Sequence, residues 1–388
     1  MDRTDDIKLP ADTAWLNDAG TKAVCTALTA EGGDVFFVGG CVRDALLDVD
    51  GADVDLSTPL LPQDVMRLAK AAGLKVIPTG IDHGTVTVVS GGQGFEVTTF
   101  RRDVETDGRR AVVAFSTNIK DDARRRDFTL NALYATAEGR VVDPLGGLDD
   151  CMNRRIRFIE DAGQRIQEDY LRILRYFRFH AWYSDPAAGF DPDALQAIAA
   201  NTSRLETLSA ERVGGEMLRL LAAPDPTPAI AVMRQTGCLQ RVLPGSDDRL
   251  LGPVVHFDVT ADPIVRLAAL GGEDVADRWR LSRADARHLN LVSQAAYGSA
   301  PLPEIAYRHG EDVALGAAAI RAALAQTPLA PPEIDAIKTA AAAQFPVTAA
   351  DLMPEFQGAA LGQKLAALEA RWIASGFTLT REDLVTSG

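Results

Sequence analysis

Cysteine is scarce in this sequence, and long apolar runs are absent. The 388 residues include four cysteines, and no two of them have C-x-x-C spacing. This argues against a zinc site or a disulfide framework and predicts reduced thiols in a cytoplasmic protein. No apolar run approaches the ~20 residues of a membrane-spanning helix, so no membrane partner is expected. The polar, acidic N-terminus that begins Met1-Asp2-Arg3 is unlike a secretory signal.

Basic residues are fewer than acidic residues. The formal net charge of −14 argues against indiscriminate binding to nucleic acid. The arginines are nevertheless concentrated in the middle of the chain, which allows one positive cleft on an acidic body. The alternative is that many of them pair with nearby acids. The arginines of this region are Arg101, Arg102, Arg109, Arg110, Arg124, Arg125, Arg126, Arg154, Arg155, Arg157, Arg165, Arg172, Arg175 and Arg178.

A glycine pair follows a short apolar run near the N-terminus. Residues 35–38 are Val-Phe-Phe-Val, which is typical of a buried strand, and Gly39 and Gly40 then predict a tight turn. A helix is expected to start around Arg43. A strand, a glycine turn and a helix start together present backbone N–H groups to which a phosphate can bind. Arg43 would add a positive charge there.

Two aspartates follow, with apolar residues between and after them. Residues i and i+2 of a strand share a face, so the carboxylates of Asp53 and Asp55 are expected side by side. Their repulsion favours a bound cation, and oxygen ligands near a phosphate favour Mg²⁺. The alternative is a polar turn. Glu96, the one acid in a predicted strand over 95–100, is either a third acid of this site or an ordinary solvent-facing residue.

A run of three arginines precedes an apolar stretch at 124–133. Phe128, Leu130 and Leu133 are expected to pack inward while Arg125 or Arg126 reaches a triphosphate, which the planar guanidinium suits. Such a run is more often a solvated face when it occurs alone.

Residues 168–179 have the pattern of one amphipathic helix. Leu171, Leu174 and Phe177 recur at helical spacing and would face the core. Four polar residues at i, i+3 steps form a stripe on the helix, either for binding or for salt bridges within it. These residues are Asp169, Arg172, Arg175 and Arg178.

Three motifs occur in a characteristic order: Gly-Gly-x-x-Arg-Asp followed by Asp-x-Asp, then Arg-Arg-Asp-Phe-Thr-x-Asn-Ala, then Glu-Asp-x-x-Arg-x-x-Arg. Together they resemble the class II CCA-adding tRNA nucleotidyltransferases, within the tRNA nucleotidyltransferase/poly(A) polymerase family. The resemblance implies an α+β fold in which a DNA-polymerase-β-like head is followed by an all-helical neck, body and tail. The implied boundaries are 1–150 for the catalytic head, 151–222 for the neck, and 223–388 for a tRNA-binding body and tail.

The same resemblance implies a reaction. CMP and AMP would be added without a template to the 3′ end of tRNA, by a two-metal mechanism that releases pyrophosphate. Asp53 and Asp55 would be catalytic and, with Glu96, would hold Mg²⁺. The partners would be CTP, ATP and the 3′ end and acceptor arm of tRNA. The implied nucleotide-binding residues are Gly40, Arg43, Arg125, Arg126, Asp169, Arg172, Arg175 and Arg178.

The implied base selection is chemically sound. Cytosine and adenine both carry an exocyclic amine beside a ring-nitrogen acceptor, so Asp169 could accept from the amine while Arg172 donates to the ring. Uracil and guanine present a carbonyl and an N–H instead. One pair of side chains could therefore admit CTP and ATP.

Other functions stay open at this stage. One is a poly(A) polymerase, or an enzyme that adds only CC or only A. The Gly-Ile-x-His-Gly-Thr-Val stretch at 80–86 and a charged loop at 101–115, expected to be mobile, favour full CCA addition. Transfer to a small molecule or a protein would not need so long a helical half. A non-catalytic RNA-binding protein would be expected to lose Asp53 and Asp55.

The remaining chain is predicted to be helical. A single amphipathic helix is expected over 11–31, and Ala/Leu-rich patterns interrupted by Pro and Gly predict the helices of the C-terminal half. The latter cover Pro228–Thr236, Pro263–Leu270, Arg283–Ala296, Glu311–Ala325 and Pro332–Ala343.

Overall fold

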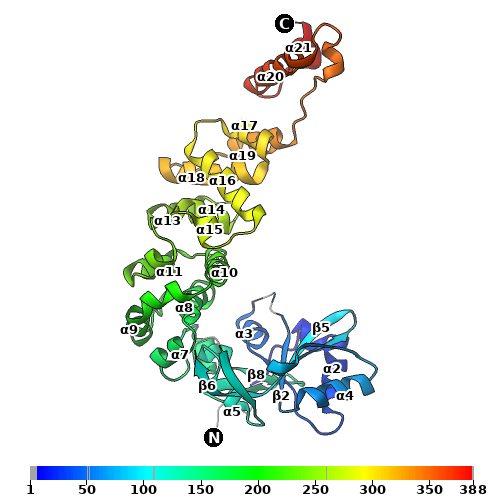
Figure 1. The fold of residues 1–388 in the computed structure, drawn as a ribbon, viewed down its shortest axis with the longest axis vertical. Coiled ribbons are helices and arrows are strands. Elements are labelled where there is room, and N and C mark those ends of the chain that lie inside the picture. The colour runs from blue at the N-terminus through cyan, green and yellow to red at the C-terminus, as the bar shows by residue number, and fades with distance from the viewer. Residues whose placement is uncertain (1–6, 50, 52, 108–109, 259, 387–388) are drawn as a thin grey trace. The chain divides into compact units, whose positions relative to one another are not determined.

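The computed structural model describes residues 7–49, 51, 53–107, 110–258 and 260–386 (Figure 1). The chain forms two compact units. The first comprises residues up to Leu208 together with Gln235–Arg241, and the second comprises Ser209–Arg234 and the chain from Val242 onward.

The first unit contains a seven-stranded sheet with the strand order β3-β4-β5-β2-β1-β8-β9. Strand β2 runs parallel to β5 and antiparallel to β1. A separate hairpin is formed by β6 (Arg101–Asp107) and β7 (Arg110–Phe115). The strands of the sheet are β1 (Phe36–Val38), β2 (Asp55–Thr58), β3 (Lys75–Gly80), β4 (Thr85–Ser90), β5 (Gln93–Thr99), β8 (Tyr134–Thr136) and β9 (Val141–Val142).

One face of the sheet is covered by helices. Val86, Val88, Phe95 and Val97 alternate with polar residues along β4 and β5 and are fully buried. They lie beneath α2 and α4, which pack on these two strands. This alternation is typical of a sheet with one buried face and one open face. The helices and short 3₁₀ turns of this region are α1 (Ala14–Asn17), α2 (Ala19–Thr29), α3 (Gly40–Leu47), α4 (Pro62–Ala71), η1 (Ile81–His83), α5 (Ile119–Arg124), η2 (Thr129–Asn131) and α6 (Leu148–Met152).

The prediction of one helix over 11–31 is wrong. Asp18 has extended backbone angles, and its carboxylate accepts a hydrogen bond from the Thr21 N–H at 2.9 Å. It therefore begins a new helix, α2, after the short α1. An N-cap of this kind interrupts a helix even where the apolar periodicity continues across it.

The helices α7 (Ala162–Glu168), α8 (Leu171–Tyr183) and α9 (Pro192–Asn201) and the 3₁₀ segment η3 (Thr202–Thr207) complete most of the first unit. Strands are confined to residues 36–142 of the described chain, apart from isolated bridges, and helices follow. Leu171, Leu174 and Phe177 are buried, as predicted. Helix α12 (Cys238–Val242) lies at the boundary of the two units.

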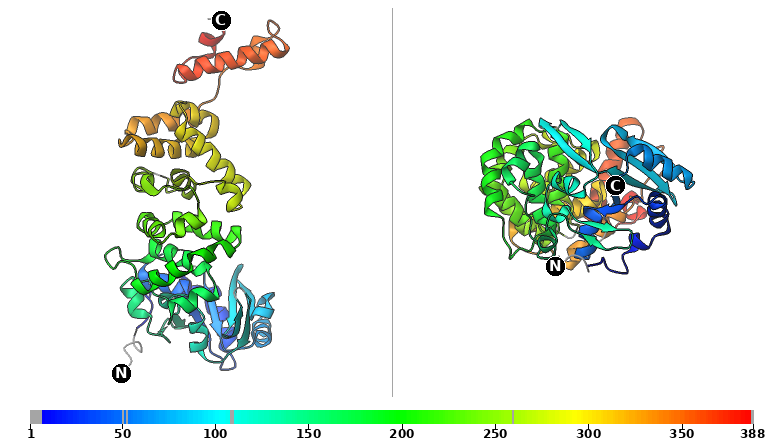
Figure 2. Two further views of the ribbon diagram at one scale, coloured as in Figure 1. Left: turned by 60° about the vertical axis from the view of Figure 1, so that its left-hand side comes forward. Right: turned by 90° about the horizontal axis from the view of Figure 1, so that it is seen from below.

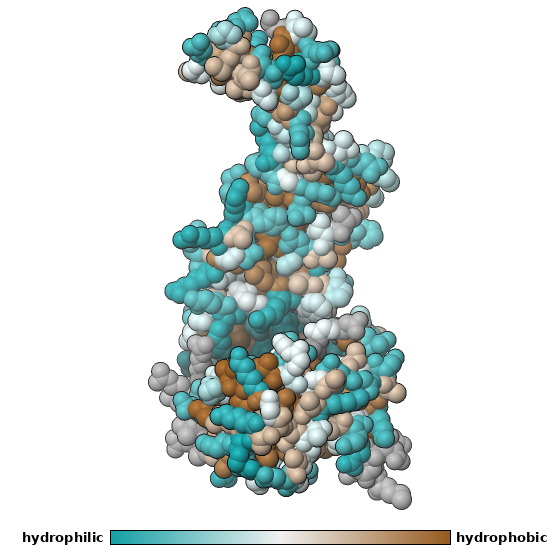
Figure 3. Space-filling model, turned by 90° about the vertical axis from the view of Figure 1, so that its right-hand side faces the viewer, coloured by the Kyte–Doolittle hydropathy of each residue, from teal (hydrophilic) through white to brown (hydrophobic). Residues whose placement is uncertain are grey.

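The second unit consists of helices (Figure 2). The five helices predicted from the Ala/Leu-rich patterns are all present, with ends within one residue of those expected. Hydrophilic residues predominate on the face of this unit drawn in Figure 3. Its elements are α10 (Ala210–Leu221), α11 (Thr227–Gln235), η4 (Asp248–Leu250), α13 (Leu251–Phe257), α14 (Pro263–Leu270), α15 (Val275–Arg278), α16 (Arg283–Tyr297), α17 (Leu302–His309), α18 (Glu311–Ala325), α19 (Pro331–Ala342), η5 (Ala349–Leu352), α20 (Gly358–Ala374) and α21 (Arg381–Thr386).

Small residues allow the central helix of this unit to pack closely. Helix α18 is buried along most of its length, and a Cβ added to Gly316 would lie 2.5 Å from a methyl carbon of Val265 on α14. Alanine and glycine at these positions therefore set the spacing between α18 and α14. In the described residues, no helix is both long and apolar enough to cross a bilayer.

His180 gives the first unit a pH-dependent stability. Its ring is 5% exposed and stacks on Phe190 with 3.9 Å between ring centroids. Burial lowers the pKa of His180 from 6.5 to about 3. Between these values the unfolded chain binds a proton that the folded chain does not, so the free energy of unfolding falls as the pH falls.

We expect His180 to contribute a loss of about 2 kcal/mol of stability between pH 7 and pH 5. His180→Phe keeps an aromatic ring but cannot be protonated. Urea unfolding at the two pH values should therefore show a shallower pH dependence in the variant. Because carboxylates contribute equally to both proteins, identical pH dependences would contradict the prediction.

Candidate active site

The predicted strand, glycine turn and helix are present. Gly39 joins β1 to α3 with a φ of +75°, and Gly40 is the first residue of the helix. A Cβ added to Gly39 would lie 3.2 Å from Nη1 of Arg126. The turn therefore needs glycine for its conformation, and it brings the backbone close to a guanidinium group.

Asp55 and Glu96 lie on neighbouring strands, and Asp53 lies two residues before the first of these strands. Asp53 and Asp55 are exposed while Val54 and Leu56 are buried, so the two carboxylates lie on the same side of the chain, as predicted. Strand β2 begins at Asp55, two residues later than the expected strand. The parallel register pairs Asp55 with Glu96 on β5, and Glu96 is also exposed.

The carboxylates repel one another. The pKa of Asp55 is raised to about 6, first by partial burial, then by the charge of Glu96 and to a smaller extent by that of Asp53. Arg126 acts in the opposite direction. A cation placed among these oxygen atoms would relieve the repulsion, so the donor set fits a hard divalent ion.

Among the described residues, no three His, Cys, Asp or Glu side chains form a ready-made metal cage. Mg²⁺ typically binds to one or two carboxylates, with water and substrate phosphate as its other ligands. Asp53 and Asp55 suit that kind of site, and the role of Glu96 as a third ligand stays a prediction.

Of the two arginines considered for the triphosphate, Arg126 is the one beside the glycine turn. Its Nη2 donates to Oδ2 of Asp122 at 3.1 Å, and its Nε donates to the Tyr134 hydroxyl at 3.3 Å. The side chain is 26% exposed. For Arg125, the carbonyl oxygen accepts a hydrogen bond from Nη2 of Arg172 at 3.1 Å.

Arg43 is held inside the fold. It is 5% exposed, and its guanidinium donates to Asp44, Asn131 and the hydroxyl of Tyr183 at 2.7, 2.6 and 2.8 Å. It also lies 3.9 Å from the centre of the Tyr183 ring. Arg43 thus connects α3 with α8, and its direct contact with a phosphate stays a prediction.

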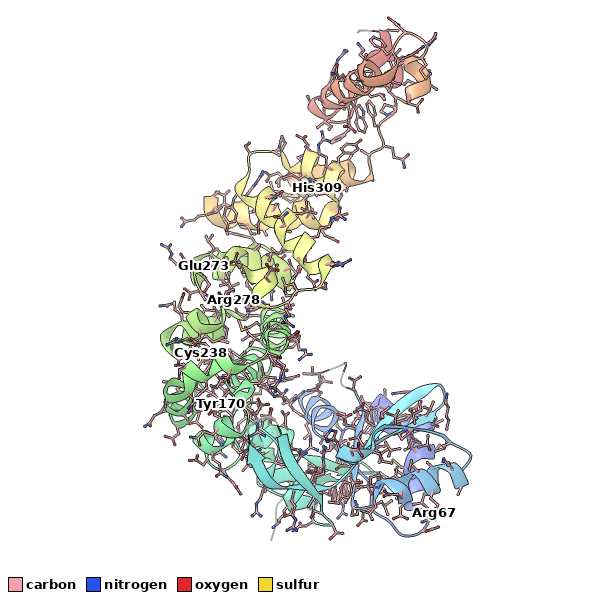
Figure 4. All side chains as sticks on the ribbon, viewed as in Figure 1. Arg67, Tyr170, Cys238, Glu273, Arg278 and His309 are labelled. Atoms are coloured by element: carbon pink, nitrogen blue, oxygen red, sulfur yellow. The ribbon has the colours of Figure 1, made fainter. Side chains whose placement is uncertain are left out.

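The prediction of one helix over 168–179 is wrong at its start. Helix α7 ends at Glu168, and α8 begins at Leu171 after Tyr170, which is labelled in Figure 4. The carboxylate of Asp169 accepts a hydrogen bond from the Leu171 N–H at 3.1 Å. Asp169 therefore lies at the entrance to α8 rather than on the polar stripe of a single helix.

Arg172 and Arg175 join α8 to the 125–127 segment. Arg172 donates to Glu168, to the carbonyl of Arg165 and to that of Arg125. Arg175 binds the buried carboxylate of Asp127 at 2.6 Å. Arg178 lies over the ring of Phe179, 4.6 Å from its centre.

Several of these partners are not predicted by the sequence patterns. Asp122, four residues before Arg126, could have been found from its i, i+4 spacing on a helix. Asp127 lies within the Arg-Arg-Asp-Phe motif, but the motif alone does not indicate its ion pair with Arg175. Asn131 and Tyr183 carry no local signal for their contacts with Arg43, because those contacts depend on tertiary structure.

The predicted loop at 101–115 is a two-stranded hairpin. Nη1 of Arg101 donates to the carbonyl of His83 at 2.7 Å, and the Phe115 ring lies 2.8 Å from where a Cβ of Gly84 would be. The base of the hairpin is thus seated on the turn at 80–86. Gly108 and Arg109 lie outside the described residues, and the mobility of the hairpin stays a prediction.

Two parts of the chain match known protein families. Residues 35–157 match the poly(A) polymerase head domain, and residues 189–250 match a probable RNA- and SrmB-binding site of polymerase A. The first match begins at the strand that leads into the glycine turn and includes both aspartates and the three arginines.

The chain is similar to named relatives over about half its length. It is 40% identical over 203 residues to human mitochondrial CCA tRNA nucleotidyltransferase 1, covering 52% of this chain and 47% of that protein. It is also 40% identical over 220 residues to the CCA-adding enzyme of Geobacillus stearothermophilus, covering 56% and 52%. The matched segment therefore spans about half the length of these curated relatives.

Solved structures extend the likeness to nearly the whole chain. The crystal structure of the Bacillus stearothermophilus CCA-adding enzyme in complex with CTP matches with a TM-score of 0.76 and 29% identity over 92% of both chains. The Thermotoga maritima CCA-adding enzyme complexed with tRNA has the same fold, with a TM-score of 0.69 and 18% identity. These matches confirm the predicted fold class, a DNA-polymerase-β-like head followed by helices. Two parts of the chain thus match poly(A) polymerase family models, and its fold is similar to that of the CCA-adding enzymes.

Proposed function

We propose that this chain adds CMP and AMP to the 3′ end of tRNA and releases pyrophosphate. The observation that carries the proposal is the position of Asp55, which lies near Arg126 and in register with Glu96, while Arg126 abuts the Gly39 turn. Carboxylates for a cation thus adjoin groups suited to phosphate. The names of the similar enzymes support the same reaction.

In the proposed reaction, the 3′-hydroxyl oxygen of the tRNA attacks the α-phosphorus of CTP or ATP. The hydroxyl loses its proton to solvent, a new P–O bond forms, and the bond between the α-phosphorus and the oxygen that bridges to the β-phosphate breaks, so that pyrophosphate leaves with the negative charge. Backbone N–H groups at Gly40 and the guanidinium of Arg126 would hold the triphosphate in line for this attack. Arg125 and Arg43 would support the same site.

We assign Asp53 and Asp55 the role of holding divalent metal, with Mg²⁺ as the ion and Glu96 as a candidate third ligand. The carboxylate oxygen atoms of these residues are the kind of ligand that a hard divalent ion prefers. When bound here, Mg²⁺ would lower the pKa of the attacking hydroxyl and neutralise charge on the leaving pyrophosphate.

Base selection would fall to Asp169 and Arg172. The guanidinium of Arg172, on α8, donates to Glu168 and to the carbonyl of Arg165 on α7, and to the carbonyl of Arg125. A guanidinium fixed in this way could donate to cytosine or adenine without a further loss of rotamer entropy on binding. Arg175 and Arg178 would support the pair.

Each of three parts of the chain has a proposed role. We propose residues 1–150 as the catalytic head, 151–222 as the neck that reads the base, and 223–388 as the body and tail that bind the acceptor arm of tRNA. We also propose that the protein acts in the cytoplasm. Cys25, Cys41, Cys151 and Cys238 are free and buried, which suits a reducing compartment.

The test uses the purified chain, Mg²⁺ and a tRNA transcript that lacks its last three nucleotides. Each labelled nucleoside triphosphate is offered alone, and CTP is then offered with ATP. Two C additions followed by one A, with no use of UTP or GTP, is the expected result. Addition that stops after CC, or that starts only from a CC end, would indicate a partial enzyme, and a long A tail would indicate a poly(A) polymerase. No incorporation would contradict the proposal.

A further inference from the structure

One buried carboxylate touches several segments around the proposed site. Asp122 is 1% exposed. Its Oδ2 accepts hydrogen bonds from the Tyr134 hydroxyl at 2.7 Å and from Nη2 of Arg126 at 3.1 Å, with the Ser57 hydroxyl at 3.4 Å. Its Oδ1 faces the backbone N–H of Arg101 at 3.4 Å.

The charge state of Asp122 suits this position. Burial by itself raises the pKa of the carboxyl group, but the charge of Arg126 and the hydrogen bond from Tyr134 lower it below its ordinary value. The group is therefore a carboxylate at neutral pH. An unpaired buried carboxylate is costly, so Asp122 and Arg126 hold each other in place.

Two hydrogen-bond partners of Asp122 lie next to parts of the proposed site. Ser57 is two residues after Asp55 on β2. Arg126 has its Nη1 against the Gly39 turn while its Nη2 binds Asp122. One carboxylate thus fixes the direction of the guanidinium and also contacts the strand that begins at Asp55.

An arginine side chain loses rotamer entropy when it is fixed in one conformation. If Asp122 and Tyr134 fix Arg126 before the nucleotide arrives, that entropy is lost on folding rather than on binding. Preorganisation of this kind strengthens ligand binding without any new contact to the ligand.

We propose that Asp122 is a positioning residue for nucleotide binding. It holds Arg126 with Nη1 directed at the glycine turn, where the triphosphate of CTP or ATP would bind. This inference rests on the phosphate-binding role given to Arg126 in the proposed function. Asp122 itself touches neither the nucleotide nor the metal.

Asp122→Asn is the direct test. The amide keeps the size of the side chain, but in either orientation it replaces one acceptor oxygen with a donor, and it removes the charge opposite Arg126. We expect about tenfold weaker binding of both CTP and ATP, measured by calorimetry on the full chain with Mg²⁺ and without tRNA. Binding of CMP, which lacks the triphosphate, should be unchanged.

A double-mutant cycle separates positioning from a general structural role. If Asp122 acts through Arg126, the variant with both Asp122→Asn and Arg126→Ala should bind CTP no more weakly than Arg126→Ala alone. The matched control is Thr58→Val. Thr58 is equally buried and next to Ser57, but its hydroxyl donates to the carbonyl of Asp34, away from Arg126. Its CTP affinity should stay at the wild-type value.

Three results would overturn the proposal. Asp122→Asn could weaken CTP binding by the same factor in the Arg126→Ala background as in wild type, or it could weaken CMP binding as much as CTP binding. Arg126→Ala could also leave CTP binding unchanged. If Asp122→Asn does not fold, Tyr134→Phe replaces it, because it removes the hydroxyl that joins Asp122 to Arg126; about threefold weaker CTP binding is expected. Because binding is measured without tRNA, a chain that binds CTP but does not extend tRNA would contradict the proposed function and leave this inference standing.

Discussion

Asp55→Asn is expected to slow nucleotide addition by a factor on the order of 10³ to 10⁴ while leaving the fold intact. An amide retains the size of the side chain but removes the charge that would hold a divalent ion. The pKa of Asp55 is raised because partial burial and the like charges of Glu96 and Asp53 together outweigh the attraction of Arg126. Loss of its charge relieves that repulsion, so the fold should not be weakened.

Two measurements check this prediction. The first is the rate of CMP addition to the shortened tRNA at saturating CTP. The second is the thermal midpoint in the presence of EDTA and of Mg²⁺: wild type should be stabilised by Mg²⁺ more than the variant, because a ligand that binds only the folded state raises stability. Without metal, the variant should melt at or above the wild-type temperature.

Asp64→Asn is the matched control for this experiment. Asp64 is a partly exposed aspartate in the first turn of α4, paired with Arg67 at 3.4 Å. Its replacement should change neither the rate nor the response to Mg²⁺. An Asp55→Asn variant that retains most of its rate, or that melts well below wild type in EDTA, would contradict the assignment of Asp55 to the metal.

Local sequence signals predicted those features that depend on local structure. The strand, glycine turn and helix at 35–47 follow from residues that are contiguous in the chain, and the Ala/Leu-rich helices of the second unit follow from their 3.6-residue period. The burial of Phe128, Leu130 and Leu133 follows in the same way, from their apolar character within one motif.

The pairing of Asp55 with Glu96 goes beyond what local sequence signals can establish. It depends on the parallel register of β2 and β5, which are joined by a segment that contains α4, β3 and β4. A shift of one residue in that register would turn Glu96 to the other face of the sheet. The position of Glu96 is therefore a property of the assembled sheet.

The two errors in helix boundaries have one physical cause. At Asp18 and Asp169, apolar residues continue at helical spacing across an aspartate that instead accepts a hydrogen bond from a following backbone N–H. The periodicity of a long window outweighs a single aspartate when only the sequence is considered. In the structure Asp18 is the N-cap of α2, whereas Asp169 ends α7 and lies one residue before Tyr170, the N-cap of α8. The burial of Arg43 could not be predicted from local sequence either, because it depends on Asn131 and Tyr183, which lie far away in the chain.

Arg172→Lys is expected to relax the choice of nucleotide. Lysine keeps the positive charge but lacks the planar fork of donors, and it cannot reproduce the contacts of Arg172 with Glu168 and Arg125. Loss of a fixed pair of hydrogen bonds to a base is worth about 1–3 kcal/mol of discrimination. We therefore expect the preference for CTP over UTP, as a ratio of kcat/KM values, to fall roughly 10- to 100-fold.

The ratio of the kcat/KM values for CTP and UTP is the quantity to measure, because it distinguishes a loss of base recognition from a general loss of activity. Arg172 also ties α8 to the 125–127 segment, so its replacement should slow the reaction with every nucleotide to some extent. A loss of packing alone would reduce kcat/KM for CTP and UTP by the same factor, whereas loss of base reading reduces it for CTP more. Arg67→Lys is the control, since Arg67 is an exposed arginine of α4 paired with Glu31 and should change neither value (Figure 4). An unchanged preference in Arg172→Lys, measured with the same tRNA, would remove Arg172 from the base-reading role and leave it as a link between α8 and the head.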